Sequence, residues 1–264
     1  MLKKLIKYDL KWLMKIIVIF LILGSIFAVI GRLFSLIEDS VFFNILSSVC
    51  NGISISMFLN AIFNSVFRGW ARFSINLYKD ESYLTHTLPV NKSTHFLAKV
   101  LSIVISILLS CLGLFIGLFI MYYSKENIEF IKSSLTGVSN LLDSSIFELI
   151  FVVCIVLILE IIFIVFSGIF GIVVGNTYNY KKTLKSVIYG FVIYMALNMV
   201  TIIGILIVSL FNENLKGIIF GGNAQLEFRT LVNMLYSSLG IYLIYNVGLY
   251  YVTNKIFNKG VNIE

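Results

Sequence analysis

Long apolar runs alternate with short polar connections along this chain of 264 residues. A helix needs about 20 predominantly apolar residues to cross a bilayer core, and six runs reach that length. They cover residues 16–37, 41–67, 96–123, 146–174, 187–211 and 231–252. Lipid admits only helices and closed barrels, and runs without a period of two exclude a barrel. The pattern predicts an all-α integral membrane protein, with six transmembrane helices in a single domain over residues 16–264.

The first 15 residues follow a different pattern. Leu2, Leu5, Ile6, Leu10 and Leu13 recur at helical spacing, and lysines fill most of the remaining face. This pattern predicts an amphipathic interfacial helix over residues 1–15, lying on the membrane surface with its lysines near anionic lipid. The alternative is a plain basic flank to the first span.

Composition and charge agree with a membrane protein. The chain is 59% hydrophobic and 12% charged, whereas soluble domains carry about 25% charged residues. The net charge of +7 could indicate that the chain binds nucleic acid. The positions of the charges favour another explanation, because fifteen of the twenty Lys and Arg lie on one side of the predicted topology, in residues 1–15, 68–99, 181–185 and 255–259. The positive-inside rule then places both termini in the cytoplasm. We expect no nucleic-acid partner and no large extracellular domain.

The polar segment 68–99 interrupts this apolar sequence and holds the only proline and both histidines. Pro89 must end any helix that begins near Tyr78, because proline lacks a backbone donor and restricts the residue before it. We therefore predict a short helix, a proline turn and re-entry into the membrane with Lys99 as a flanking charge. Such a helix is suited to docking a cytosolic partner.

The stretch Asp80-Glu81-Ser82-Tyr83-Leu84-Thr85-His86-Thr87-Leu88-Pro89-Val90 resembles the cytoplasmic motif of bacterial ABC-2-type exporter permeases. In that family an acidic pair, Tyr-Leu and Thr-Leu-Pro-Val lie between the second and third spans, often with Gly where this chain has Ser82. The resemblance implies that segment 68–99 is a coupling segment that contacts an ABC ATPase subunit. The implied ATPase-docking residues are Asp80, Glu81, Tyr83, Leu84, Leu88 and Pro89. Lys4, Lys7 and Lys11 of the surface helix are a second candidate contact, either with the ATPase or with lipid.

The same resemblance implies the assembly and the activity. The chain would be a permease subunit in the bacterial cytoplasmic membrane, paired with a second, identical permease subunit and two ATPase copies. No phosphate-binding Gly-x-x-x-x-Gly-Lys-[Ser/Thr] motif occurs, so we expect ATP and Mg on the ATPase, no cofactor on this chain and no enzyme activity of its own. Compact permeases of this kind resemble exporters of phenol-soluble modulins and antimicrobial peptides in Gram-positive bacteria. A cytolytic or antimicrobial peptide is therefore the first expected cargo, and drugs or lipids are the alternative.

Polar residues inside the spans are candidates for a translocation path. Asn44, Ser47, Asn51 and Ser54 share one face of the second span, where they would either line a route or bond to a neighbouring helix. Glu160 lies near the middle of the fourth span. It is either a functional carboxylate, for example in a substrate contact, or a protonated one that is hydrogen-bonded to another helix.

Other features predict packing or exclude chemistry. The pairs Gly113 and Gly117, and the series Ser167, Gly171 and Gly175, have the four-residue interval of closely packed membrane helices. The two histidines and three isolated cysteines have no metal-site spacing, so we expect no metal and no catalytic residues. Residues 212–229 suit a re-entrant or interfacial turn. Two other function classes stay open: a secondary transporter or channel without an ATPase, and a membrane scaffold that recruits a partner through residues 78–90.

Overall fold

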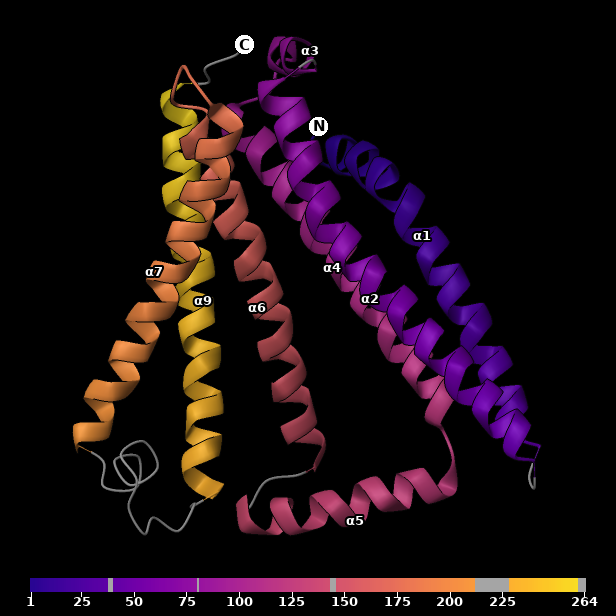
Figure 1. The fold of residues 1–264 in the computed structure, drawn as a ribbon. Helices are drawn as coiled ribbons and strands as arrows, with labels where there is room; N and C mark the ends of the chain where they lie inside the picture. Colours follow the sequence, from indigo (N-terminus) through magenta and orange to yellow (C-terminus); the bar gives the residue numbers. More distant parts are fainter. Residues whose placement is uncertain (38–39, 80, 143–145, 212–227, 261–264) are drawn as a thin grey trace. The chain divides into compact units, whose positions relative to one another are not determined.

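The computed structural model describes residues 1–37, 40–79, 81–142, 146–211 and 228–260, and every regular element in them is a helix, which confirms the all-α prediction. Asp80 and residues 212–227 of the predicted re-entrant turn lie outside the described residues. The helices (Figure 1) are α1 Leu2–Ser35, α2 Val41–Tyr78, α3 Ser82–Thr87, α4 Lys92–Tyr122, α5 Lys125–Leu142, α6 Ile146–Gly175, α7 Lys182–Phe211 and α9 Phe228–Lys259. They form two compact units, the first mainly Met1–Ile128 and the second Glu129–Asn262.

In the part of the chain that the structure describes, five helical segments are long and apolar enough to cross a membrane: α1, α2, α4, α7 and the Ile150–Gly175 part of α6. They support a multi-pass membrane protein. The sixth predicted span falls within α9, which is long enough to cross a membrane. It is less apolar than the other spans, because it contains several tyrosines and Asn246. The count of six spans and the cytoplasmic termini stay predictions.

Two helix boundaries differ from those predicted, and one helix was not predicted. α1 continues from the surface segment into the first span, and its first turns curve away from the rest of the helix (Figure 1). α2 extends beyond Phe67 to Tyr78. No glycine or proline follows Gly69 in this stretch, and the buried residues Phe73 and Leu77 continue the packed face of the helix. α5 is a helix where only a polar connection was predicted.

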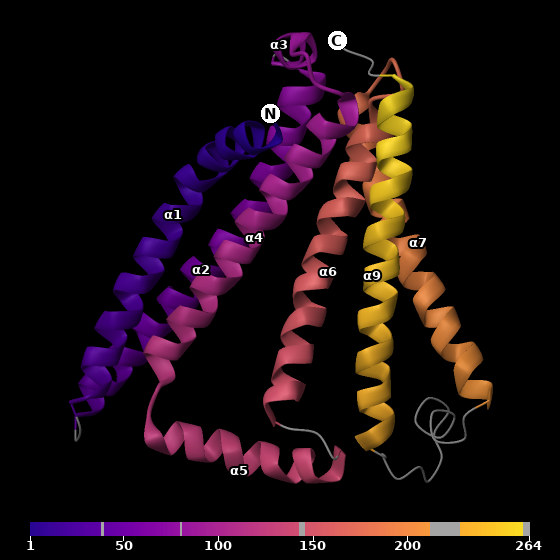
Figure 2. The ribbon, with the colours of Figure 1, turned by 180° about the vertical axis from the view of Figure 1, so that it is seen from behind.

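In the first unit α1, α2 and α4 pack against one another, side by side in both views of Figures 1 and 2. Leu13, Ile17 and Phe58 are fully buried there. A methyl group at Gly24 would lie 3.0 Å from the Phe58 ring, and one at Gly117 would overlap its other edge. The Phe58 ring therefore fits between α1 and α4 only because both positions lack a side chain.

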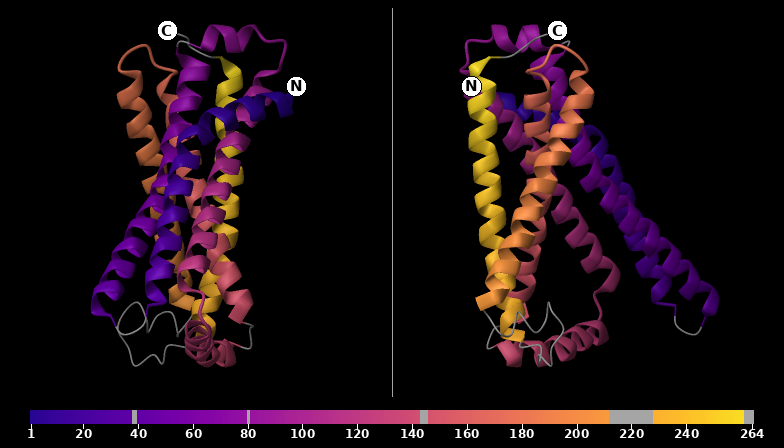
Figure 3. Two further views of the ribbon diagram at one scale, coloured as in Figure 1. Left: turned by 90° about the vertical axis from the view of Figure 1, so that its right-hand side faces the viewer. Right: turned by 60° about the vertical axis from the view of Figure 1, so that its left-hand side comes forward.

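In the second unit α6 packs against α7 and α9. Figure 3 shows α6 and α7 close together where a short turn joins them. A Cβ atom on Gly171 would lie 2.5 Å from the backbone N of Gly190, and one on Gly175 would lie 2.5 Å from the backbone N of Ser186. The small residues predicted in the fourth span therefore allow backbone-to-backbone contact, as their spacing indicates.

Candidate functional site

A buried acidic residue near the start of α1 is the centre of the candidate site. Asp9 is 3% exposed and shares the packed face of the helix with Leu13 and Ile17, each four residues further along. Positions four apart lie on one helix face. Lys4, Lys7 and Lys11 lie on the opposite face and are exposed. The helix thus turns its only acid inward and its lysines outward.

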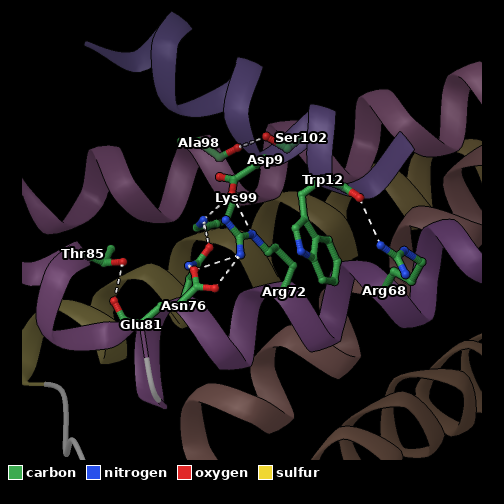
Figure 4. A network of polar contacts seen from close by, with 10 residues as sticks. All are labelled: Asp9, Trp12, Arg68, Arg72, Asn76, Glu81, Thr85, Ala98, Lys99 and Ser102. Atoms are coloured by element: carbon green, nitrogen blue, oxygen red, sulfur yellow. Dashed lines mark hydrogen bonds and ion pairs between the residues drawn. The ribbon is translucent and has the colours of Figure 1, made fainter. Parts of the chain in front are cut away.

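Asp9 pairs with cations from two other helices (Figure 4). Its Oδ1 accepts hydrogen bonds from Arg72 Nε of α2 at 3.1 Å and from Lys99 Nζ of α4 at 2.5 Å. The Lys99 side chain is almost fully buried. A buried charge is tolerated when it is paired and hydrogen-bonded, and Asp9 supplies that pairing for both cations.

The same network continues to the residue directly before α3. Arg72 Nη1 donates to both carboxylate oxygens of Glu81, at 3.1 and 2.9 Å. Asn76 donates to Glu81 through Nδ2 and accepts from Lys99 through Oδ1. We call Asp9, Arg72, Asn76, Glu81 and Lys99 the charge cluster. It connects α1, α2 and α4 to the start of α3.

The charges within the charge cluster balance. Its two carboxylates, Asp9 and Glu81, face two cations, Arg72 and Lys99. Removing one partner of a buried pair leaves an uncompensated charge and costs about 3–5 kcal/mol. The cluster is thus a strong constraint on four helices, although replacing all its members by apolar residues need not destabilise the fold.

Trp12 adds a second attachment between α1 and α2. The guanidinium carbon of Arg68 lies 4.2 Å from the centre of the Trp12 ring, and that of Arg72 lies 5.2 Å from it. Arg68 Nη2 also donates to the Trp12 carbonyl oxygen at 3.0 Å. Cations over an indole face are favourable by about 0.5–2 kcal/mol. The first turns of α1 are therefore held to α2 by two arginines, Arg68 and Arg72, which both contact Trp12.

The short helix α3 presents apolar side chains outward. Tyr83 is 62% exposed and Leu84 74% exposed, while the Thr85 hydroxyl donates to the Glu81 carbonyl oxygen at 3.0 Å. Leu88 has the extended conformation (φ −66°, ψ 138°) that a following proline imposes. The predicted sequence of short helix, proline turn and returning helix is the one observed.

The structure divides the predicted docking residues into two groups. Tyr83, Leu84, Leu88 and Pro89 are exposed on or just after α3. The Glu81 carboxylate, by contrast, points into the charge cluster (Figure 4) and its side chain is only 45% exposed. Lys99, which was predicted to flank the re-entry into the membrane, is a buried partner of Asp9.

Four members of the charge cluster were not predicted as site residues: Asp9, Arg72, Asn76 and Lys99. One signal for Asp9 is present in the sequence, since it occupies the apolar face of an otherwise regular amphipathic pattern, midway between Leu5 and Leu13. An acid at that position needs a buried cation. The identity of the cations depends on how α2 and α4 pack and has no comparable signal.

The predicted translocation-path residues of α2 mostly face α1. Ser47 Oγ donates to the Gly31 carbonyl oxygen at 2.8 Å, and Ser54 Oγ donates to the Gly24 carbonyl oxygen at 2.7 Å. Asn51 lies against Gly31. These contacts favour the interhelical-packing interpretation.

The other two path candidates lie apart from that contact. Asn44 is exposed and lines a hollow of about 500 Å³ together with Val41, Ile45, Ser48 and Val49. Glu160 belongs to α6 in the second unit. Ser47, Asn51 and Ser54 thus lie together against α1, and the exposed Asn44 lies outside this contact.

Compared with protein-family models, curated proteins and solved structures, the chain matches none of them. The resemblance of residues 80–90 to ABC-2-type permeases therefore rests on the motif alone. Among the described residues, no group of three or more His, Cys, Asp or Glu side chains is arranged to hold a metal ion. The chemistry available at the candidate site is that of charge pairing and docking.

Proposed function

We propose that this chain is the transmembrane permease subunit of an ABC exporter in the bacterial cytoplasmic membrane. ATP hydrolysis on a separate ATPase subunit would drive outward export of an amphipathic or hydrophobic cargo, first of all a cytolytic or antimicrobial peptide. One observation carries the proposal. α3 holds Tyr83 and Leu84 outward while Glu81, at its start, is fixed in the charge cluster shared by three long helices.

This arrangement is suited to transmitting movement. Arg72 Nη1 donates to both carboxylate oxygens of Glu81, and hydrogen bonds between two charged groups are stronger than neutral ones. A displacement of α3 by its partner would therefore move Arg72, and through Asp9 and Lys99 it would reach α1 and α4. In this proposal nucleotide binds one conformation of the ATPase more tightly than the other, and this difference supplies the free energy. The permease chain converts it into a shift of its helices.

In the proposed assembly two identical permease subunits each receive one ATPase subunit on α3. ATP and Mg bind to the ATPase alone. The exposed lysines of α1, among them Lys4, Lys7 and Lys11, face anionic lipid headgroups or the ATPase. The surrounding bilayer covers the apolar faces of the long helices.

Co-purification of the full chain with an ABC ATPase encoded beside it tests the proposal. The variant Leu84→Asp should lose the ATPase, because a charge would be desolvated in an apolar contact. Leu36→Asp is the matched control, since Leu36 is also exposed, at 61%, and follows the other end of α1. If no ATPase binds the unmodified chain, or if Leu84→Asp binds as tightly, the exporter is rejected and a secondary transporter becomes the leading alternative.

A double-mutant cycle in the same assay separates positioning from direct contact. Arg72 is 15% exposed in its side chain and lies behind Glu81. If Glu81 acts by orienting α3, then Arg72→Ala and Glu81→Ala should weaken ATPase binding by similar factors and the double variant should be no weaker than either. Additive losses would instead assign Glu81 to the ATPase contact itself.

A further inference from the structure

Glu160 is a carboxylate within an apolar helix, α6. It lies in the Ile150–Gly175 span of α6, which contains no Lys, Arg or His, and its side chain is half-buried. Among the residues that the structure describes, it has neither an ion-pair partner nor a hydrogen bond. An acid at such a position is costly and is a functional candidate by default.

A second unsatisfied acceptor lies beside the same turn of α6. Asn246 of α9 is 7% exposed, and its Nδ2 donates to the carbonyl oxygen of Leu159, the residue before Glu160, at 3.1 Å. Only the NH₂ group of the amide can donate to a carbonyl, so Oδ1 must be the free end. Asn246 Oδ1 is buried and has no hydrogen-bond partner among the described residues. Two acceptors, on Glu160 and Asn246, thus belong to one turn of α6 and its neighbour α9, and neither receives a hydrogen bond from the described residues.

Aromatic rings surround the next turn of α6. Phe163 is 1% exposed and packs against Tyr194, Tyr242 and Tyr245, with ring centres 5.3, 5.8 and 5.6 Å away. Tyr245 does not supply the missing donor, because its hydroxyl donates to the Leu197 carbonyl oxygen at 3.1 Å. The rings of Tyr194 and Tyr242 are half-buried, and the Tyr242 hydroxyl lies within electrostatic reach of Glu160.

From this arrangement we propose that Glu160, Asn246 and the neighbouring tyrosines form a binding site for a primary ammonium group. An ammonium carries three N–H donors and no acceptor, which complements two acceptors without donors. Its positive charge matches the carboxylate, and tyrosine faces attract cations. A neutral hydroxyl would lack the charge, and a quaternary ammonium would lack the donors.

This inference rests on the proposed export function and defines its cargo more closely. A lysine side chain on an amphipathic peptide helix carries such a group on a long apolar stem. A peptide of that kind would place its apolar face among the spans and its ammonium on Glu160. The site therefore selects for lysine-containing peptides over neutral lipids and neutral drugs.

The test is a direct binding measurement that needs no ATPase. The full chain is placed in phosphatidylcholine nanodiscs, and fluorescence anisotropy follows a labelled synthetic amphipathic helix of leucine and lysine, with empty nanodiscs as the baseline. The same peptide with acetylated lysines, and again with trimethylated lysines, provides the matched probes. Glu160→Gln is compared with Glu148→Gln, which removes an acid of the same helix that is bonded to the Tyr236 hydroxyl.

We expect Glu160→Gln to weaken binding of the lysine peptide about tenfold, and Glu148→Gln to leave it unchanged. The acetylated and trimethylated peptides should bind more weakly than the lysine peptide, and Glu160→Gln should not affect the acetylated one. Asn246→Asp, which adds a carboxylate beside the same turn, should tighten binding. Equal binding of the lysine and acetylated peptides, or equal binding by Glu160→Gln and the unmodified chain, would overturn the site.

The outcome also separates this inference from the proposed function. Glu160-dependent peptide binding in a chain that recruits no ATPase would keep the ammonium site and reject the ABC exporter. ATPase recruitment without Glu160-dependent binding would reject the site alone. Circular dichroism of each variant checks that it is folded, and Asn246→Asp supplies a gain of binding that misfolding does not produce.

Discussion

The first unit fastens α1, α2 and α4 with buried charges, whereas the second unit joins α6 to α7 by backbone contact across glycines. These two kinds of contact respond differently to a force that shifts one helix against another. A charged side chain can exchange one partner for another with little backbone movement, and Arg72 already contacts both Asp9 and Glu81. Gly171 and Gly190 have no side chains to rearrange, so their helices must stay together or separate. The comparison assigns adjustable contacts to the first unit and a rigid helix pair to the second.

The largest effect should come from Asp9→Leu. The change leaves Lys99 buried without a carboxylate and removes one partner of Arg72, so the free energy of unfolding should fall by about 3–5 kcal/mol. Tryptophan fluorescence during chemical unfolding in detergent measures it, because both tryptophans, Trp12 and Trp70, belong to the first unit.

The double variant Asp9→Leu with Lys99→Leu is the control for this prediction. It removes a whole ion pair, and Arg72 keeps Glu81, so part of the lost stability should return. If the double variant is less stable than Asp9→Leu alone, the charge cluster is not the main constraint on these helices and the comparison between the units fails.

Gly171→Ala should have the next largest effect, a loss of about 1–3 kcal/mol. The added methyl group would lie 2.5 Å from the backbone N of Gly190, and a backbone cannot rotate away as a side chain can. Circular dichroism should record the loss, while the tryptophan signal of the first unit changes less. Gly204→Ala on α7 is the matched control, because a methyl group there meets no atom within 4 Å. Equal losses for the two variants would contradict the rigid-pair interpretation.

The smallest effect should come from Ser54→Ala. It removes the hydrogen bond to the Gly24 carbonyl oxygen, and such bonds between membrane helices average about 0.6 kcal/mol. Ser48→Ala is the control, because the exposed Ser48 bonds only within its own helix, to the Asn44 carbonyl oxygen. Thermal unfolding in detergent checks the stability, and cargo export should be unchanged. A strong loss of export at normal stability would return Ser54 to the translocation path.

The fold class could be predicted from the sequence because each long helix carries its own signal. A run of about 20 apolar residues that crosses lipid must form a helix, because its backbone polar groups can only bond within the segment. The four-residue interval of Ser167, Gly171 and Gly175 indicates a close contact between helices. Helix ends were predicted less well. α2 continues past Arg68 and Arg72, which contact Trp12 and Asp9 of α1, and only the packed structure supplies those partners.

The candidate site could be predicted only in part, for a related reason. The exposed face of α3 follows from a local motif ending at Pro89. The charge cluster joins residues that are 63 and 90 positions apart in the chain, and no local pattern encodes such pairings. Glu81 illustrates the difference, since it belongs to the local motif at the start of the short helix and the structure alone reveals that its carboxylate points inward.

The position of Asp9 in the chain has a consequence for biogenesis. Arg72 and Lys99 are synthesised 63 and 90 residues after Asp9. The first helix is therefore made before either of the two cations that pair with its acid. The pairing closes only when the start of α4 has been made, so translation up to that point sets the earliest moment at which the first three long helices can lock together.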